Sequence, residues 1–249
     1  FLTPEMRREF GGTAGNIGYN LKLLGEEPLV MATVGEDIQP YLERFGELGI
    51  PTRLLTRVPG QFTAQAFITT DLDDNQITAF HPGAMNHSHK NHVTPELGAR
   101  LAIIGPDGKE GMLQHARECA ASAVPFLLDP GQGLPMFSGE EIREFLRLAD
   151  YVAVNDYEGK LLEEKTGRKL ELLAREVAVS RRERGGIDRD VSEYECADAL
   201  GVADRVVDGD VIRERSAVQH EPVQAEPIHN GFQVEEVVVH RVVLGKTAR

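Results

Sequence analysis

The sequence predicts an α/β protein with a mostly parallel sheet flanked by helices and a small β lid. Three observations lead to this prediction. Short apolar runs alternate with amphipathic segments of helix length from about residue 14 to residue 178. Glycines and polar residues follow the apolar runs, where parallel strands would end. Two strand-like runs are joined by a turn sequence alone, which is typical of a hairpin.

The elements of the first half follow from periodicity and breakers. We expect a helix over 16–24, a buried strand over 28–34 and a helix over 38–48 that Gly49 ends. The hairpin strands are expected at 63–70 and 76–80, on either side of the turn Asp71-Leu72-Asp73-Asp74-Asn75. We interpret the region from about 52 to 81 as a lid.

The alternation resumes in the second half. Strands are expected at 100–104, 125–128 and 151–154, and helices at about 108–121, 139–148 and 157–165. Because each strand is followed by a helix, the strands should pair in parallel.

Composition restricts the function classes. The net charge of −13 argues against nucleic acid or an anionic membrane as a partner, because both require basic surface. Cys119 and Cys196 lie far apart, so we expect two reduced thiols and no disulfide or zinc site. No apolar stretch approaches the roughly 20 residues that span a bilayer, and no signal peptide is visible. We therefore expect a cytoplasmic protein.

Four histidines between residues 81 and 92 raise the question of a metal site. They are His81, His87, His89 and His92. Their spacing does not match the ligand patterns of zinc sites on a defined element, so we interpret the segment as a polar loop.

A glycine-rich segment carries the clearest functional signal. Gly11 and Gly12 let the backbone approach a ligand closely, and Asn16 adds an amide that both donates and accepts hydrogen bonds. Such a group suits a polyol. Alone, the pattern is more typical of an ordinary glycine-rich turn before a helix. Gly25 and Gly35 follow at longer spacings and favour the ligand-binding interpretation.

This spacing resembles the N-terminal signature of the ribokinase-like (PfkB) carbohydrate and nucleoside kinases. Gly18 stands where that family usually has Ala, Ser or Thr. Residues 76–85 and Leu128-Asp129-Pro130-Gly131 look like segments of bacterial adenosine-kinase-like members, and the resemblance covers about residues 1–178. It implies a ribokinase-like fold, ATP and Mg²⁺ as cofactors, and Gly11, Gly12 and Asn16 as residues that bind the acceptor.

A second motif follows the strand expected at 151–154. Asn155 and Glu158 form an Asn-x-x-Glu pattern, which in the family helps to organise Mg²⁺ and the phosphates of ATP. Oxygen ligands with one carboxylate suit Mg²⁺, here held indirectly through Glu158. The same pattern is also an ordinary helix capping box. The glycine motif upstream favours phosphoryl transfer.

The last third departs from the family. Residues 179–185 resemble its nucleotide-contacting strand and turn, with Arg182 replacing a glycine. The family's Asp-Thr-x-Gly-Ala-Gly-Asp motif, which holds the phosphoryl group and supplies the general base, is missing, and Asp210 is its nearest and weak counterpart. We expect a kinase domain over 1–178 that lacks the family's first strand, and an atypical tail over 179–249 that is frame-shifted or disordered. A genuine alternative domain is the rival interpretation.

Two functions stay open. In the first, the chain transfers the γ-phosphoryl group of Mg-ATP to a primary hydroxyl of a nucleoside, adenosine before ribose or another sugar. In the second, the chain is a non-catalytic remnant or a nucleoside-binding protein, because it lacks an identifiable catalytic Asp. An unpaired hairpin edge also suggests a homodimer through the lid strands.

Overall fold

A computed structural model describes residues 6–73 and 75–183 of the 249-residue chain. The chain separates into two compact units. Among the described residues, the larger contains 6–67 and 79–183, and the smaller contains 68–73 and 75–78. The elements below belong to the larger unit, except for the tip of one hairpin.

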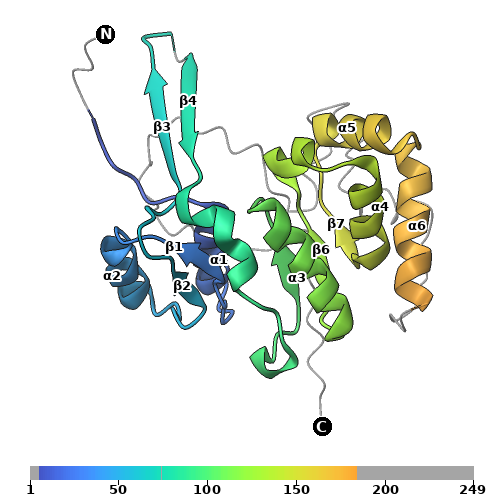
Figure 1. The fold of residues 1–249 in the computed structure, drawn as a ribbon, viewed down its shortest axis with the longest axis horizontal. Coiled ribbons are helices and arrows are strands. Elements are labelled where there is room, and N and C mark those ends of the chain that lie inside the picture. Colours follow the sequence, from blue (N-terminus) through green and yellow to red (C-terminus); the bar gives the residue numbers. More distant parts are fainter. Residues whose placement is uncertain (1–5, 74, 184–249) are drawn as a thin grey trace, which may run out of the picture. The chain divides into compact units, whose positions relative to one another are not determined.

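The first part of the larger unit is a short parallel ladder with two helices (Figure 1). Its elements are α1 (Thr13–Leu23), β1 (Ala32–Val34), α2 (Gln39–Leu48) and β2 (Leu55–Arg57). β1 and β2 pair in parallel from Ala32 opposite Leu55 to Val34 opposite Arg57. Val30, Phe45 and Ile50 form a small buried core beside them. The left-handed backbone of Gly49, φ 64°, ends α2 as predicted.

The predicted hairpin is confirmed. β3 (Gln65–Thr70) and β4 (Gln76–His81) form a two-stranded sheet. In the turn, Asp71 Oδ1 accepts hydrogen bonds from the backbone N–H groups of Asp73 and Asn75, both at 2.9 Å. β2 falls within the range of 52–81 expected for the lid and pairs in parallel with β1.

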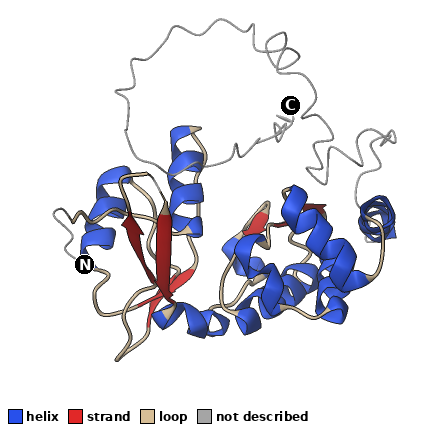
Figure 2. Ribbon diagram, turned by 90° about the horizontal axis from the view of Figure 1, so that it is seen from above, coloured by secondary structure: helices blue, strands red, loops and turns tan. Residues whose placement is uncertain are grey.

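The second part is a three-stranded parallel sheet with helices packed along it (Figures 1 and 2). The strands are β5 (Ala102–Ile104), β6 (Phe126–Leu128) and β7 (Tyr151–Val152), in that order across the sheet. The helices are α3 (Lys109–Ala121), α4 (Gly139–Leu148), α5 (Asp156–Thr166) and α6 (Leu170–Glu183). Parallel pairing confirms the predicted α/β class for this region.

This second part holds the larger core. Phe126, Phe145 and Met112 are almost fully buried and come from β6, α4 and α3. The rings of Phe137 and Phe145 meet edge to face with centroids 5.0 Å apart. Burial of this aromatic surface is the main favourable term for the sheet and its helices.

α6 bears on two predictions, the strand and turn expected over 179–185 and the domain boundary expected at residue 178. Residues 179–183 are helical, so the expected strand and turn are wrong over these residues, and Arg184 and Gly185 lie outside the described residues. The cause is visible in buried Leu173, Ala174 and Val177, whose helical spacing continues the apolar face. The domain boundary expected at residue 178 therefore falls inside a helix. No helix within residues 6–73 and 75–183 is long and apolar enough to cross a membrane.

The histidine segment is also more regular than predicted. Three short 3₁₀ helices connect the larger elements: η1 (Gly83–Lys90), η2 (Pro95–Leu97) and η3 (Gly131–Met136). His87 and His89 belong to η1, and His81 ends β4. The polar-loop interpretation is therefore wrong for η1, which is a 3₁₀ helix with Ala84 and Ser88 buried.

Candidate active site

Residues with chemical potential gather where the parallel strands end. Gly105 directly follows β5, and Asp129 directly follows β6. Asn155 lies three residues after Val152, the last residue of β7. The start of α1 lies beside this edge, since a Cβ on Gly105 would meet Cγ2 of Thr13 at 2.8 Å. In parallel α/β sheets ligands bind at this end of the strands.

The predicted glycine segment forms an exposed loop that leads into α1. Gly12 is the N-cap with φ 91°, a conformation that L side chains rarely adopt. A Cβ added to Gly11 or Gly12 would have no atom within 4 Å, so the surface above this loop is open. The N–H of Asn16 donates to the carbonyl of Gly12 at 3.0 Å, and the Asn16 side chain is exposed. The helix thus begins three residues earlier than predicted, and Asn16 lies in its first turn.

Asn155 and Glu158 meet at the start of α5. The N–H of Glu158 donates to Asn155 Oδ1 at 2.9 Å, and the N–H of Asn155 donates to Glu158 Oε2 at 3.1 Å. This is a complete capping box, so the local structural interpretation of the motif is realised. Ser138 and Glu141 form the same box at the start of α4. Among the described residues, no hydrogen bond joins the α5 pair to the glycine loop.

Asp129 is a site residue that the sequence did not single out. Burial raises the pKa of its carboxyl, and the nearby negative charge of Glu158 raises it further. Its backbone N–H donates to Ile104 at the end of β5, 2.9 Å away, which fixes its position between strands. The available signal was the same as for Asn155, a polar residue directly after an apolar strand. Within the described part of the chain, no group of three or more His, Cys, Asp or Glu could hold a metal.

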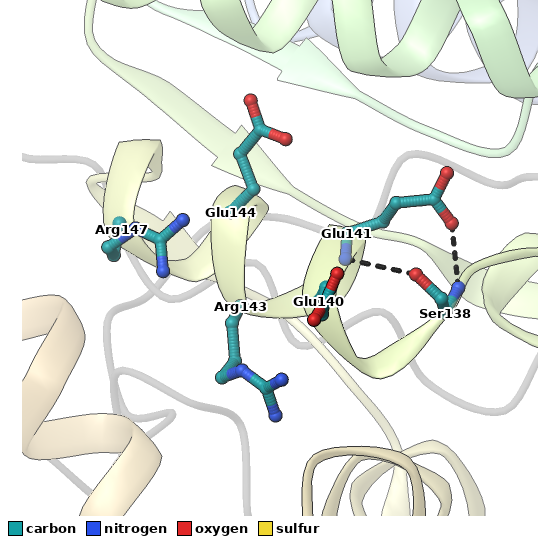
Figure 3. Close-up of a pocket in the computed structure, with 6 residues that line it drawn as sticks. All are labelled: Ser138, Glu140, Glu141, Arg143, Glu144 and Arg147. Atoms are coloured by element: carbon teal, nitrogen blue, oxygen red, sulfur yellow. Dashed lines mark hydrogen bonds between the residues drawn. The ribbon is translucent and has the colours of Figure 1, made fainter.

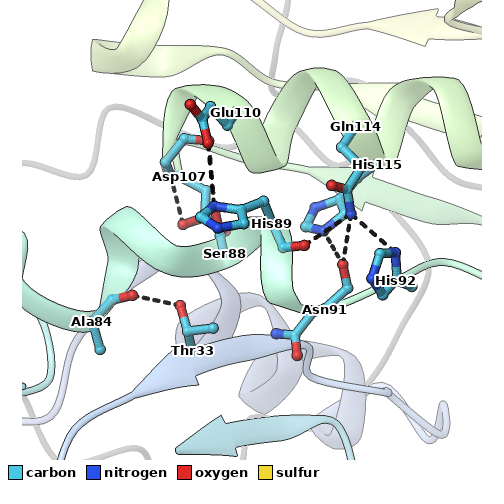
Figure 4. Close-up of polar contacts among 11 residues, drawn as sticks. Thr33, Ala84, Ser88, His89, Asn91, His92, Asp107, Glu110, Gln114 and His115 are labelled. Carbon is cyan, nitrogen blue, oxygen red and sulfur yellow. Dashed lines mark hydrogen bonds and ion pairs between the residues drawn. The ribbon is translucent and has the colours of Figure 1, made fainter. Parts of the chain in front are cut away.

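Asp107 adds a second acid near the end of β5 (Figure 4). It accepts a hydrogen bond from the N–H of Gly108 at 2.7 Å, in the turn that precedes α3. Burial raises the pKa of this carboxyl to about 6, although hydrogen bonds from Gly108 and Ser88 act in the opposite direction. Asp107 therefore titrates closer to neutral pH than an exposed carboxyl.

The histidines connect η1 and the following loop to α3 (Figure 4). His115 Nε2 lies 3.0 Å from the carbonyl of Asn91, and burial lowers the pKa of this imidazole. His92 Nδ1 lies 2.7 Å from Glu118 Oε1. His89 Nδ1 lies 3.5 Å from Glu110 Oε2. These contacts hold the segment between the two halves of the larger unit against α3, which is a structural role.

One polar cavity lies along α4, away from the predicted site residues. It has a volume of about 610 Å³ and contains none of the predicted site residues. Figure 3 shows its lining, which comes entirely from α4 and its N-cap: Ser138, Glu140, Glu141, Arg143, Glu144 and Arg147. It is an open polar surface along one helix, where a ligand would meet walls on one side only. Asp210, the weak candidate for the catalytic base, lies outside the described residues.

The comparison with family models decides the classification. A model described as the pfkB family carbohydrate kinase matches residues 2–181. The chain belongs to this family. Nucleoside kinases of Methanocaldococcus jannaschii and Methanothermobacter thermautotrophicus are 30% and 29% identical to this pfkB family member, each over 62% of the chain and 51% of the relative. The chain thus spans about half the length of the curated relatives it matches.

Solved structures support the same family and its fold. The Burkholderia thailandensis nucleoside kinase in complex with inosine is 54% identical, with a TM-score of 0.67, over 71% of this chain and 59% of that one. The Methanocaldococcus jannaschii nucleoside kinase is 27% identical, with a TM-score of 0.65, over 70% of this chain and 58% of that one. The predicted ribokinase-like fold is therefore confirmed.

Proposed function

We propose that this pfkB family protein is an ATP-dependent nucleoside kinase that phosphorylates a primary hydroxyl of its acceptor. The observation that carries the proposal is the 54% identity to a nucleoside kinase whose structure contains inosine. The same relative has a structure in complex with ADP-inosine. The open glycine loop and the polar strand ends described above are compatible with these two kinds of ligand.

The exposed loop at the start of α1 is the proposed acceptor site. Gly11 and Gly12 bring backbone within reach of a ligand, and the exposed amide of Asn16 both donates and accepts. Hydroxyl groups of a ribose match such partners. Adenosine is the acceptor that the sequence favours, inosine is the one that the relative suggests, and a free sugar such as ribose is the alternative.

The ends of β6 and β7 are the proposed site for the phosphates of ATP and for Mg²⁺. Asp129, Asn155 and Glu158 offer oxygen ligands, which Mg²⁺ prefers. The raised pKa of Asp129 beside Glu158 fits this role, because a cation would relieve the repulsion between the two carboxylates. When bound, Mg²⁺ neutralises the charge of the phosphates. The chain's own contribution is to orient the side chains of Asn155 and Glu158, which the capping box holds at the start of α5.

A non-catalytic nucleoside-binding protein is the second candidate. The observation that favours it is the missing Asp-Thr-x-Gly-Ala-Gly-Asp motif, because the proton of the acceptor hydroxyl then has no assigned base. We further propose that residues after the kinase region form an atypical tail. A compact fragment in protease mapping of residues 184–249 would instead support an alternative domain.

The test of the main proposal is a kinase assay on the full chain. Mg-ATP is supplied with adenosine, inosine, ribose or fructose, and both ADP and the phosphorylated acceptor are measured. We expect product with the nucleosides at rates of about 1 to 100 per second. Binding without product would favour the second candidate, and faster phosphorylation of a free sugar would overturn the choice of acceptor.

Two matched variants separate capping from phosphate binding. Glu158→Gln keeps the capping box, because Gln also serves at this position, but removes the charge. Glu141→Gln makes the same change in the box of α4. We expect only Glu158→Gln to reduce activity and Mg-ATP binding by 10-fold or more, on the order of one lost charged contact. Equal effects of the two variants would contradict a role for Glu158 beyond capping.

A further inference from the structure

One side chain from α2 reaches the glycine loop. The hydroxyl of Tyr41 donates to the carbonyl of Gly11 at 2.7 Å, across 30 residues of sequence. Burial raises the pKa of Tyr41, so the hydroxyl keeps its proton at neutral pH and stays a donor. No part of the sequence pattern that identifies the loop includes Tyr41.

The peptide group between Gly11 and Gly12 connects this contact to the ligand side of the loop. Because a trans peptide is planar, the direction of the Gly11 carbonyl sets the opposite direction of the Gly12 N–H. No cis peptide occurs among the described residues, so this relation applies here. Within the described part of the chain, the Gly12 N–H has no acceptor, and a Cβ built on Gly11 or Gly12 would meet no atom within 4 Å. It is thus a donor available to a ligand.

We propose that Tyr41 is a positioning residue, which fixes the Gly11–Gly12 peptide so that the Gly12 N–H faces a hydroxyl of the nucleoside. The inference rests on the proposed function, since it assumes that this loop binds the acceptor. Two consecutive glycines have unusually free backbone dihedrals. An external hydrogen bond is therefore what restricts this peptide to one orientation before the ligand arrives.

Packing around Tyr41 shows why the side chain can act as a fixed anchor. Its ring meets Phe10 and Phe45 edge to face, with centroids 5.1 and 4.9 Å apart. Gly15, in the first turn of α1, leaves room for the Tyr41 hydroxyl, since a Cβ on this glycine would collide with Tyr41 Oη. The ring is thus held from α2, from the segment before the loop and from the first turn of α1.

The first experiment replaces Tyr41 with Phe in the full chain, with Tyr19→Phe as the matched control. The Tyr19 hydroxyl has no hydrogen-bond partner among the described residues, although its ring lies 5.6 Å from the guanidinium of Arg44. We expect the Kd for inosine, measured by calorimetry, to rise about 3- to 10-fold in Tyr41→Phe, the factor for one neutral hydrogen bond. The Kd for Mg-ATP and the melting temperature should match those of Tyr19→Phe.

Amide hydrogen exchange of residues 11–16 separates this inference from the proposed function. Failure of the wild-type chain to bind inosine would contradict the proposed function for this chain, while faster exchange at 11–16 in Tyr41→Phe would still support the positioning role. Unchanged exchange together with an unchanged Kd for inosine would overturn the positioning role.

A second pair of variants uses Gly15. Gly15→Ala should push Tyr41 away and weaken inosine binding by at least the factor seen in Tyr41→Phe. Adding Tyr41→Phe to Gly15→Ala removes the hydroxyl that collides, so the double variant should bind inosine more tightly than Gly15→Ala alone. Tyr41→Phe thus weakens inosine binding in the wild-type chain but strengthens it in the Gly15→Ala variant. Additive losses in the double variant would show that the two positions act independently and would overturn the inference.

Discussion

Asp107 shows how one buried carboxyl gives this protein a pH-dependent stability. Burial raises its pKa to about 6 in the folded chain, from an ordinary value of 3.8. Between these values the folded carboxyl holds a proton that the unfolded one has lost. Its contribution to stability is therefore complete below about pH 4 and is lost as the pH rises to about 6.

Asp107→Asn tests this at single-residue resolution, because Asn keeps the acceptor for the Gly108 N–H and does not titrate. We expect the free energy of unfolding of the wild type, minus that of the variant, to fall between pH 4 and 6 and to stay level above. Urea unfolding at a series of pH values measures this difference. Asp73 is an exposed carboxyl in the hairpin turn. Asp73→Asn is the control that shows whether loss of any negative charge gives the same pH dependence of stability. If the difference in free energy of unfolding between the wild type and Asp107→Asn did not change with pH, the buried carboxyl of Asp107 would not be a source of pH-dependent stability.

At the scale of residues, the sequence predicted where candidate residues lie in the fold better than which contacts they make. Gly11, Gly12, Asn16, Asn155 and Glu158 all lie near strand ends or helix starts, because glycines and polar residues interrupt apolar runs there. The sequence offered a capping box as one of two interpretations of Asn155 and Glu158, and the structure contains that box. The sequence could not identify Asp129 or Tyr41, which matter through contacts with residues 29 and 30 positions away.

At the scale of elements, two helix glycines make opposite predictions. Gly46 in α2 is exposed, and a Cβ there would have no atom within 4 Å, so Gly46→Ala should stabilise the protein by about 0.5 to 1 kcal/mol. Gly18 in α1 is buried, and its Cβ would meet Val30 Cγ2 at 2.5 Å. Overpacking then exceeds the gain in helix propensity, and Gly18→Ala should destabilise by about 1 kcal/mol. Urea unfolding of both variants checks the signs, and stabilisation by Gly18→Ala would mean that Val30 yields without cost.

The elements that sequence predicted well are those with strong local signals. α4 was predicted over its full range, because its apolar face repeats at helical spacing and Ser138 provides an N-cap. β2 was missed, since a three-residue strand carries almost no periodicity and is defined by its pairing with β1. α6 was not predicted, because its apolar face is defined by packing against the core and the arginine-rich sequence near residue 181 obscures the helical pattern.

At the scale of the whole molecule, the hairpin bears on assembly. All of β4 is exposed, and the side chains of Phe67, Ile77 and Phe80 are 61%, 79% and 50% exposed. An open strand edge with apolar side chains favours pairing with another copy. We expect the full chain to be a dimer by light scattering, and Ile77→Ser to shift it towards monomer. Leu72→Ser changes a still more exposed apolar residue in the turn and should leave the dimer intact. A monomeric wild type would contradict the lid-strand dimer.

Ligand binding couples the proposed site to the stability of the whole chain, whether or not catalysis occurs. A nucleoside at about 100 times its Kd stabilises the folded state by about 2.7 kcal/mol, if it binds only that state. For a chain of this size, the melting temperature should then rise by roughly 5 to 10 °C. We expect this rise with adenosine or inosine, and a smaller one with ribose, because a free sugar offers no base to contact.

Thermal shift and product formation together distinguish the two functional candidates. A kinase shows both the shift and the phosphorylated nucleoside, whereas a nucleoside-binding remnant shows the shift alone. Asn16→Ala should reduce the shift in either case, because in the proposed site the amide contacts the acceptor rather than the reacting phosphate. A wild-type chain with neither shift nor product would contradict the acceptor site itself. Binding at Gly11 and Gly12 requires no general base, so the missing catalytic motif alone would not explain a failure to bind. Such a result would mean that the glycine loop itself does not bind the acceptor.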